Sequence, residues 1–350
     1  MKKTQWIVLG VAMVLSLGLL FALYLTSPMS GEIYRASFNR RFMDTLLIMP
    51  GSAINIKFNS FYVAGYSDTM LYLGNSTAPF YLFKTNLAMT DTSHVIVRVS
   101  LDSIKNPAYT RISVVSPNFY VTNGIHPFIL KGDIYNWAAS PIMQDSDYFF
   151  TESVAFSPTG FALKSYSYQT KGYELAKKSI SDFTFYNELL EKQVDGIFCV
   201  DGRLMFNKKL NKLVYLYFYR NEFIVSDTSF NINYRAHTID TIRYAQVKVA
   251  ILGDGKESML GSPPAIINGL NCTDGDFLFI QSNLLAKNED IDQFKSSSTI
   301  DCYNLASGEY LASFHVPNFQ KERLSGFQII DDKLFALFGS YLVQYHLNLP

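Results

Sequence analysis

The chain has 350 residues, and its 30 basic residues balance its 30 acidic residues. A balanced charge gives no global field that would recruit nucleic acid, so nucleic-acid binding is disfavoured. The three cysteines, Cys199, Cys272 and Cys302, allow one disulfide at most. The fold must therefore depend on its hydrophobic core, and small buried cysteines are the simplest interpretation of these thiols.

The first segment along the chain is an uncharged apolar run over residues 6–26, preceded by Lys2 and Lys3. About 20 apolar residues cross a bilayer as a helix, so the run predicts a membrane segment. No small-residue cleavage site follows it, which favours an uncleaved anchor over the alternative, a secretory signal peptide. We expect residues 1–31 to form a cytoplasmic tail and an anchor. Residues 32–350 would form one extracytoplasmic domain, periplasmic in a Gram-negative bacterium.

One eight-residue pattern then recurs six times, with alternating apolar residues before a tight turn and an apolar residue after it. The copies are residues 54–61, 112–119, 154–161, 197–204, 270–277 and 327–334. This pattern predicts a strand, a turn and the start of a second strand. A distance of about 40 to 50 residues between successive copies of a strand pattern is typical of a β-propeller.

Further strand-like runs follow each copy, for example residues 213–219, 222–226 and 231–235 after the fourth. Four strands make one propeller blade, so six copies predict an all-β, six-bladed propeller. The last unit has only three strands before the chain stops. Residues 33–42 are strand-like and left over, and we expect them to add the outer strand of the last blade, which closes the ring and hides both edges.

Three stretches are less regular. Residues 241–266 lengthen the fourth unit, and residues 286–298 are polar and expected to form an exposed insertion. Residues 183–186 fit an outer strand, while a short helix around residues 186–192 is the alternative.

With the blades laid out, residues 32–350 resemble the six-bladed β-propellers of the TolB-like and NHL-like class, particularly envelope proteins with an N-terminal membrane segment. The resemblance implies a shared fold. It implies little about activity, because propellers include both binding proteins and enzymes.

Residues just before each copy, and those between the second and third strands, are expected to surround the mouth of the central channel. The first group contains Ser52, Arg111, Glu152, Asp195, Asn268 and Ser325, and the second contains Asn75, His126, Arg220 and Glu222. From these groups we predict a ligand-binding set. It consists of Arg111, His126, Glu152, Asp195, Arg220 and Asn268. The alternative is that these side chains cap strand ends and bind water.

Glu152, Asp195 and Asn268 offer oxygen atoms from three blades and are candidate ligands for Ca²⁺, which takes six to eight oxygens. The resemblance extends here to lactonase-like six-bladed propellers, although only part of their Glu, Asn, Asn and Asp set can be placed. A Ca²⁺-dependent, lactonase-like hydrolase is thus the alternative function. The five histidines show no zinc spacing, and no other cofactor is expected.

The sequence favours a membrane-anchored, extracytoplasmic binding or assembly module for a protein of the envelope or a small polar ligand, without assigned catalytic residues. Residues 6–26 provide the contact with the membrane. A sensor or accessory part of a membrane system is a third interpretation.

Overall fold

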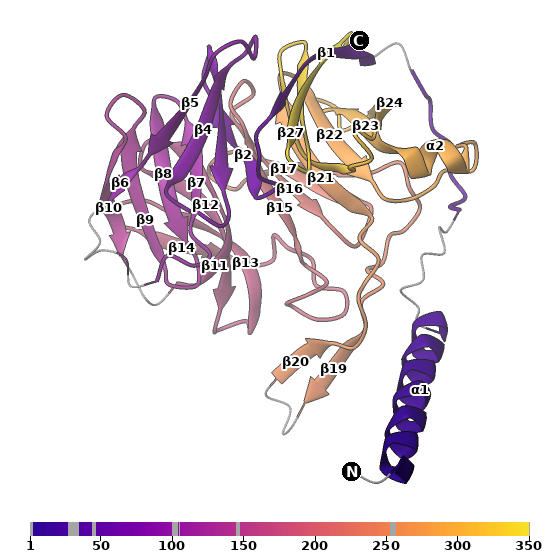
Figure 1. Ribbon diagram of the computed structural model, residues 1–350. Coiled ribbons are helices and arrows are strands. Elements are labelled where there is room, and N and C mark those ends of the chain that lie inside the picture. Colours follow the sequence, from indigo (N-terminus) through magenta and orange to yellow (C-terminus); the bar gives the residue numbers. More distant parts are fainter. Residues whose placement is uncertain are drawn as a thin grey trace.

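The computed structural model describes residues 3–26, 35–43, 47–99, 104, 106–144, 148–252 and 257–349 (Figure 1). Within these residues the domain is built of β-strands. A long helix, α1 (Lys3–Thr26), precedes it, and a short helix, α2 (Ile291–Ser296), lies inside it.

Helix α1 is apolar on all sides. Its segment Thr4–Leu25 has a mean hydropathy of 2.5. The most apolar part of this segment is not buried against the rest of the described protein. Trp6 is 61% exposed and Leu15 is 68% exposed. An apolar helix without protein neighbours is typical of a membrane span. The helix is long and apolar enough for that role, although secretory signals meet the same criterion.

The described strands form six sets of four, and each set begins with an innermost strand that contacts an innermost strand of a neighbouring set. The first three sets are β2 (Phe61–Tyr66), β3 (Met70–Asn75), β4 (Tyr81–Asn86), β5 (Thr92–Ile96); β7 (Arg111–Val115), β8 (Asn118–Asn123), β9 (Phe128–Asp133), β10 (Ala138–Gln144); and β11 (Phe150–Ser157), β12 (Gly160–Ser167), β13 (Gly172–Lys178), β14 (Phe183–Tyr186). The other three are β15 (Gly202–Asn207), β16 (Lys212–Tyr217), β17 (Glu222–Ser226), β18 (Ile232–His237); β21 (Asn268–Asp274), β22 (Phe277–Ser282), β23 (Ser297–Asn304), β24 (Tyr310–Pro317); and β25 (Leu324–Ile330), β26 (Lys333–Phe338), β27 (Tyr341–Leu347), β1 (Leu47–Asn55).

Three pairings lie outside this scheme. Strands β2 and β7, which belong to the first two sets, pair in parallel. The short strand β6 (Arg98–Val99) pairs in parallel with β10. Strands β19 (Val249–Leu252) and β20 (Glu257–Leu260) form a separate hairpin that projects from the sheets, on the side where α1 also lies in Figure 1. The predicted insertion at residues 241–266 therefore contains this hairpin.

Hydrophobic clusters fill the spaces between successive sets, including the space between the last set and the first. In that space, Leu71 and Leu73 of β3 pack with Phe335 and Leu337 of β26. The middle strands are consequently covered on both faces. β17 is buried along its whole length, and β26 reads KLFALF without polar alternation. Continuous apolar runs are expected for strands that are buried on both faces.

The predicted closing strand was wrong. Strand β1 (Leu47–Asn55), not residues 33–42, pairs with β27, in an antiparallel register that runs from Leu47 opposite Leu347 to Asn55 opposite Tyr341. Residues 33 and 34 lie outside the described part of the chain. Residues 35–42 instead lie against the β21–β24 set, with isolated bridges from Arg35 to Leu285 and from Phe42 to Ser313.

A buried charge cluster explains why residues 35–42 lie there. The guanidinium group of Arg40 donates to Glu289 Oε2 at 2.6 Å and to Asp301 Oδ1 at 2.8 Å. The Arg40 side chain is fully buried in this arrangement. A buried cation needs buried acceptors, and both of these carboxylates belong to the β21–β24 region.

Two other expectations need correction in part. The first and fourth copies of the repeat do not mark innermost strands, because residues 54–61 join the end of β1 to the start of β2, and β15 begins only at Gly202. Residues 286–298 are largely exposed, as expected, but Glu289, Ser297 and Ser298 within them are buried. The other four copies coincide with an innermost strand, a turn and a second strand.

Candidate ligand-binding cavity

A cavity of about 660 Å³ lies between the innermost strands of all six sets. Its wall is formed by residues 63–68, 113–116, 154–155, 204–209, 271–275 and 328. These residues occupy the later parts of the innermost strands and several of the turns that follow them. The cavity is therefore built by the same feature that defines the fold, the convergence of the innermost strands.

Gly65 allows two of these strands to meet. Strand β2 bulges between Val63 and Gly65 and pairs in parallel with β7, with Gly65 opposite Val114. Gly65 has a φ of 143°, and a Cβ atom there would lie 2.0 Å from the carbonyl oxygen of Val114. Any other residue at this position would be strained and would push β2 away from β7, because only glycine readily adopts such a φ.

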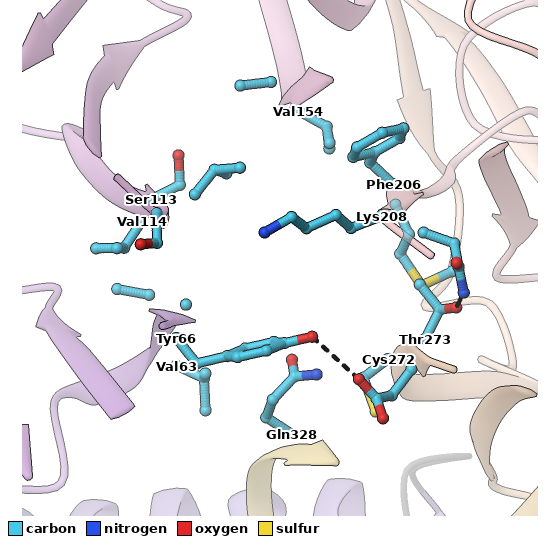
Figure 2. A pocket seen from close by; sticks show the side chains of 18 of the residues that line it. Val63, Tyr66, Ser113, Val114, Val154, Phe206, Lys208, Cys272, Thr273 and Gln328 are labelled. Carbon is cyan, nitrogen blue, oxygen red and sulfur yellow. Dashed lines mark hydrogen bonds between the residues drawn. The ribbon is translucent and has the colours of Figure 1, made fainter. Parts of the chain in front are cut away.

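Much of the wall is apolar. Figure 2 shows Val63, Val114, Val154 and Phe206 around the open space. Cys272 also lies in the wall, but its side chain is buried, and burial raises the pKa of its thiol well above the usual value. The thiol therefore stays protonated near neutral pH and behaves as a small apolar group.

Lys208 supplies a positive charge. It follows β15, and its amino group extends into the cavity in Figure 2. No hydrogen bond or ion pair of this amino group occurs among the described residues, whereas the neighbouring Lys209 pairs with Asp276 at 2.7 Å. The two lysines thus differ, since one is neutralised at the surface and the other faces the cavity.

Asn207 holds the turn that carries Lys208. Its side-chain amide donates to Thr273 Oγ1 at 2.6 Å and to the carbonyl oxygen of Gly275 at 3.1 Å. Its side-chain oxygen, Oδ1, accepts a hydrogen bond from the backbone N–H of Leu210 at 2.8 Å. Asn207 is buried, so these bonds fix the start of the turn against the next innermost strand.

A hydrogen-bonded carboxylate, that of Asp274, lies in the adjoining part of the wall, between the two residues that Asn207 contacts. The Tyr66 hydroxyl donates to Asp274 Oδ1 at 3.0 Å (Figure 2), and the backbone N–H of Asp331 donates to Asp274 Oδ2 at 3.1 Å. Burial raises the pKa of Asp274, although the hydrogen bonds from Tyr66 and Asp331 oppose this shift. Burial likewise raises the pKa of Tyr66, which therefore remains a neutral donor.

None of the six predicted contact residues lines this cavity. Arg111 and Asn268 are the first residues of β7 and β21, at the opposite ends of the innermost strands. Arg111 is exposed and its guanidinium group lies 4.8 Å from the ring centre of Tyr62. His126 is exposed in the turn between β8 and β9.

The three candidate calcium ligands have separate partners. Glu152 accepts from Arg203 Nη1 at 3.1 Å, and burial raises the pKa of Glu152 while Arg203 and Lys164 oppose the shift. Asp195 Oδ1 accepts from the backbone N–H of Cys199 at 2.8 Å. The Asn268 side chain is buried and donates to backbone carbonyl oxygens. Within the described residues, no group of three or more His, Cys, Asp or Glu side chains is placed to hold a metal ion.

Arg220 is buried instead of facing the channel. Its Nε atom lies 2.9 Å from Glu222 Oε2, and its guanidinium group lies 3.6 Å from the ring centre of Tyr217. Its Nη1 atom donates to the carbonyl oxygen of Glu191 at 3.0 Å. These contacts are those of a residue that stabilises its own set of strands.

Sequence reasoning did not select Lys208 or Tyr66. The position of the repeat along the chain could have identified them. In several sets, the turn that follows the innermost strand borders the cavity. With the fourth copy placed too early, Lys208 did not fall in such a turn. With the first copy placed on β1, Tyr66 was likewise not recognised as the end of an innermost strand.

No protein-family model and no curated protein matches the chain. Among solved structures, it is similar to a member of the DUF4221 family from Bacteroides vulgatus, with 10% identity, 87% of this chain and 99% of that chain covered, and a TM-score of 0.53. It is also similar to catalytically inactive virginiamycin B lyase from Staphylococcus aureus with quinupristin, with 10% identity, coverage of 85% and 99%, and a TM-score of 0.50.

Both of these proteins are β-propellers, and at such low identity the likeness concerns the fold alone. The chain therefore adopts a β-propeller fold, as its repeat predicts. The fold and the cavity together define the class of this protein, which is a β-propeller with a ligand-sized space among its innermost strands.

Proposed function

We propose that this protein is a membrane-anchored, extracytoplasmic six-bladed β-propeller of the TolB-like and NHL-like kind that binds a small polar ligand or a polypeptide segment in its central cavity. One observation carries the proposal. The cavity combines apolar walls with an unpaired ammonium group, that of Lys208. Binding sites are commonly concave and largely apolar, with a few polar groups that orient the ligand.

The six-bladed, closed architecture is supported by the strand pairing. Each of the six sets has four strands, and the outermost strand of the last set is β1, the first strand of the domain. This pairing joins the first and the last strand of the domain in one sheet and covers the edge of β27. We assign residues 32–350 to this domain and residues 1–31 to the tail and anchor.

The membrane location is supported by α1, whose length and composition suit a bilayer. A basic tail before a single span favours a domain outside the cytoplasm. Protease treatment of spheroplasts, from which any outer membrane has been removed, compared with lysed cells, tests the side of the membrane. Cleavage of the domain only after lysis would contradict the extracytoplasmic assignment.

A second contact surface is proposed at the other end of the innermost strands, where Arg111 and His126 are exposed. A protein partner in the envelope would meet these two side chains. The Ca²⁺-dependent hydrolase gains no support from a specific observation, because Glu152, Asp195 and Asn268 are each bonded to different groups.

The test is photo-cross-linking of the full-length protein in its own membrane. A photoreactive phenylalanine analogue replaces Phe206 in the cavity wall, and the matched control carries it at Tyr135, which is 83% exposed and outside the cavity. We expect a covalent adduct, detected by mass spectrometry, at position 206 and none at position 135. Adducts of equal yield at both positions, or none at position 206, would count against binding in the cavity.

A further inference from the structure

The charged groups around the cavity are unequally satisfied. Asp274 has both carboxylate oxygens engaged, by Tyr66 and by the backbone of Asp331. Asp68, the other acidic residue of the wall, is exposed, and no ion pair joins it to Lys208 among the described residues. Lys208 and Asp68 are therefore the charged side chains of the wall for which no ion pair or side-chain hydrogen bond occurs among the described residues, and the Lys208 amino group extends into the open space (Figure 2).

The backbone that carries this side chain is fixed before any ligand binds. Asn207 fixes the backbone before Lys208 through bonds to Thr273 and Gly275. The side chain then crosses the open space towards Ser113 and Val114, as Figure 2 shows. A charged donor whose base is already fixed loses less entropy when it binds a ligand.

Further polar groups lie around the same space. In Figure 2 the side chains of Ser113 and Gln328 border the open centre. The Gln328 amide donates one hydrogen bond, to the carbonyl oxygen of Ile329 at 2.8 Å, which leaves its second N–H for another acceptor. A hydroxyl and an amide N–H beside an ammonium group suit an oxyanion.

The rest of the ligand must match apolar walls. Val63, Val154 and Phe206 come from three different sets and face the same space. A volume of about 660 Å³ admits a molecule of drug-like size. Removal of apolar surface from water favours binding, so an apolar body strengthens the attachment of the anion.

We propose that the cavity binds a small molecule that carries a carboxylate or phosphate group on an apolar body, with the Lys208 ammonium group as the anchor of the anion. This assignment rests on the proposed function and narrows its ligand class. The apolar body lies against Val63, Val154 and Phe206, and the oxyanion lies between Lys208, Ser113 and Gln328.

The experiment is isothermal titration calorimetry on the full-length protein in detergent micelles. The probes are phenylacetate and phenyl phosphate as anions, and phenylacetamide as the neutral analogue. The variants are Lys208→Gln, Lys208→Arg and, as the matched control, Lys209→Gln, which removes a neighbouring charge that pairs with Asp276. Lys208 is exposed, so all variants should keep the unfolding temperature of the wild type, which is checked first.

We expect the wild type to bind at least one anion about tenfold more tightly than the amide, as a charge-assisted bond allows. Lys208→Gln should remove this preference, while Lys208→Arg and Lys209→Gln should retain it. The stronger of the two anions identifies carboxylate or phosphate as the recognised group.

Three results would overturn the assignment: no binding of either anion to the wild type, equal binding of anions and amide, or the same loss in Lys208→Gln and Lys209→Gln. A cavity-specific adduct at position 206 together with any of these results would keep the proposed binding function and reject only the anionic ligand.

Discussion

Arg40 connects residues 35–42, which follow α1 in the chain, to the rest of the domain. Its guanidinium group reaches Glu289, Asp301 and the carbonyl oxygen of Leu284. Glu289 in turn accepts from Thr299 at 2.6 Å and contacts His315 at 3.1 Å. The cluster is buried, so the loss of one member leaves others with unpaired charge.

We expect Arg40→Met to lower the free energy of unfolding by about 3–5 kcal/mol, because two buried carboxylates lose their cation. The control is Arg203→Met, since Arg203 pairs with Glu152 but is 47% exposed. Exposed pairs contribute about 0–1 kcal/mol. Urea unfolding of both variants provides the comparison, and losses of equal size would show that the Arg40 cluster is not a special contributor.

The same cluster predicts a pH dependence. Burial by itself raises the pKa of Glu289, but the hydrogen bond from His315, the charge of Arg40 and the hydrogen bond from Thr299 together hold it below its ordinary value of 4.5. Ionised Glu289 therefore stabilises the fold above the unfolded pKa. This stabilisation is lost as the pH falls through the lower folded pKa.

Unfolding free energies of the wild type and Glu289→Gln, measured from about pH 7 down to about pH 3, test this dependence. The advantage of the wild type should be constant near neutral pH and should shrink below the ordinary pKa of 4.5. An advantage that stayed unchanged over the whole range would contradict the role of the ionised carboxylate.

At the scale of elements, β1 joins the beginning of the domain to its end. It provides the edge strand of the last set and covers β27, which would otherwise present unpaired backbone groups. Residues 35–42 have a different task, since they lie against the β21–β24 set through the bonds of Arg40. Both segments are strand-like in sequence. Composition therefore did not show which of the two pairs with β27.

We expect a disulfide between Ala53→Cys and Val343→Cys, because these residues are direct partners in the β1–β27 pair. It should form under mild oxidation and raise the unfolding temperature, since it closes a loop of almost the whole domain. The matched control places the second cysteine at Leu342, whose side chain points to the other face of the strand. Equal cross-linking at positions 342 and 343 would contradict this register.

For the whole molecule, the topology assigns opposite roles to the two ends of the innermost strands. Arg35 donates to the carbonyl oxygens of Ala286 and Lys287, in the connection that follows β22. This connection lies at the same end as the start of β21, because β21 and β22 are antiparallel. The hairpin β19–β20 precedes β21 and projects on the side of α1 (Figure 1).

This arrangement predicts an orientation on the membrane. The chain between Thr26 and Arg35 reaches at most about 30 Å, so the end with the hairpin should face the bilayer. The cavity, at the other end, should open away from it. Fluorophores attached to Met259→Cys and Asp68→Cys in vesicles with quencher lipids test this, and the native cysteines are buried and should not react. Stronger quenching at position 68 than at position 259 would reverse the orientation.

The predictable part of the fold was the part that repeats. Four copies of the pattern coincide with innermost strands, because a strand, a tight turn and a second strand leave a local signature in apolar spacing and turn residues. The first copy failed because β1 is itself a strand, in which residues 51–55 alternate in burial, and its last residues fit the same pattern. The fourth failed because Asp201 and Gly202 were taken as the turn after an innermost strand, whereas Asp201 precedes β15 and Gly202 is its first residue.

The candidate site was less predictable. Arg220 and Asn268 are residue types that often bind ligands, yet both are buried here. They donate hydrogen bonds to the carbonyl oxygens of Glu191 and Tyr217, respectively. Polar type alone does not distinguish a ligand contact from a satisfied structural group, because both require the same donors and acceptors. Glu152, Asp195 and Asn268 as calcium ligands stay predictions, and so does the six-residue ligand-binding set, which adds Arg111, His126 and Arg220.

The sequence by itself determined the apolar N-terminal helix and the all-β propeller, since both follow from local periodicity and composition. Only the tertiary structure decided which strand joins β27, where Arg40 finds its carboxylates and which turn directs Lys208 into the cavity. Those outcomes depend on contacts between residues far apart in the chain. Packing and the pairing of buried charge select such contacts, and neither is visible in a local pattern.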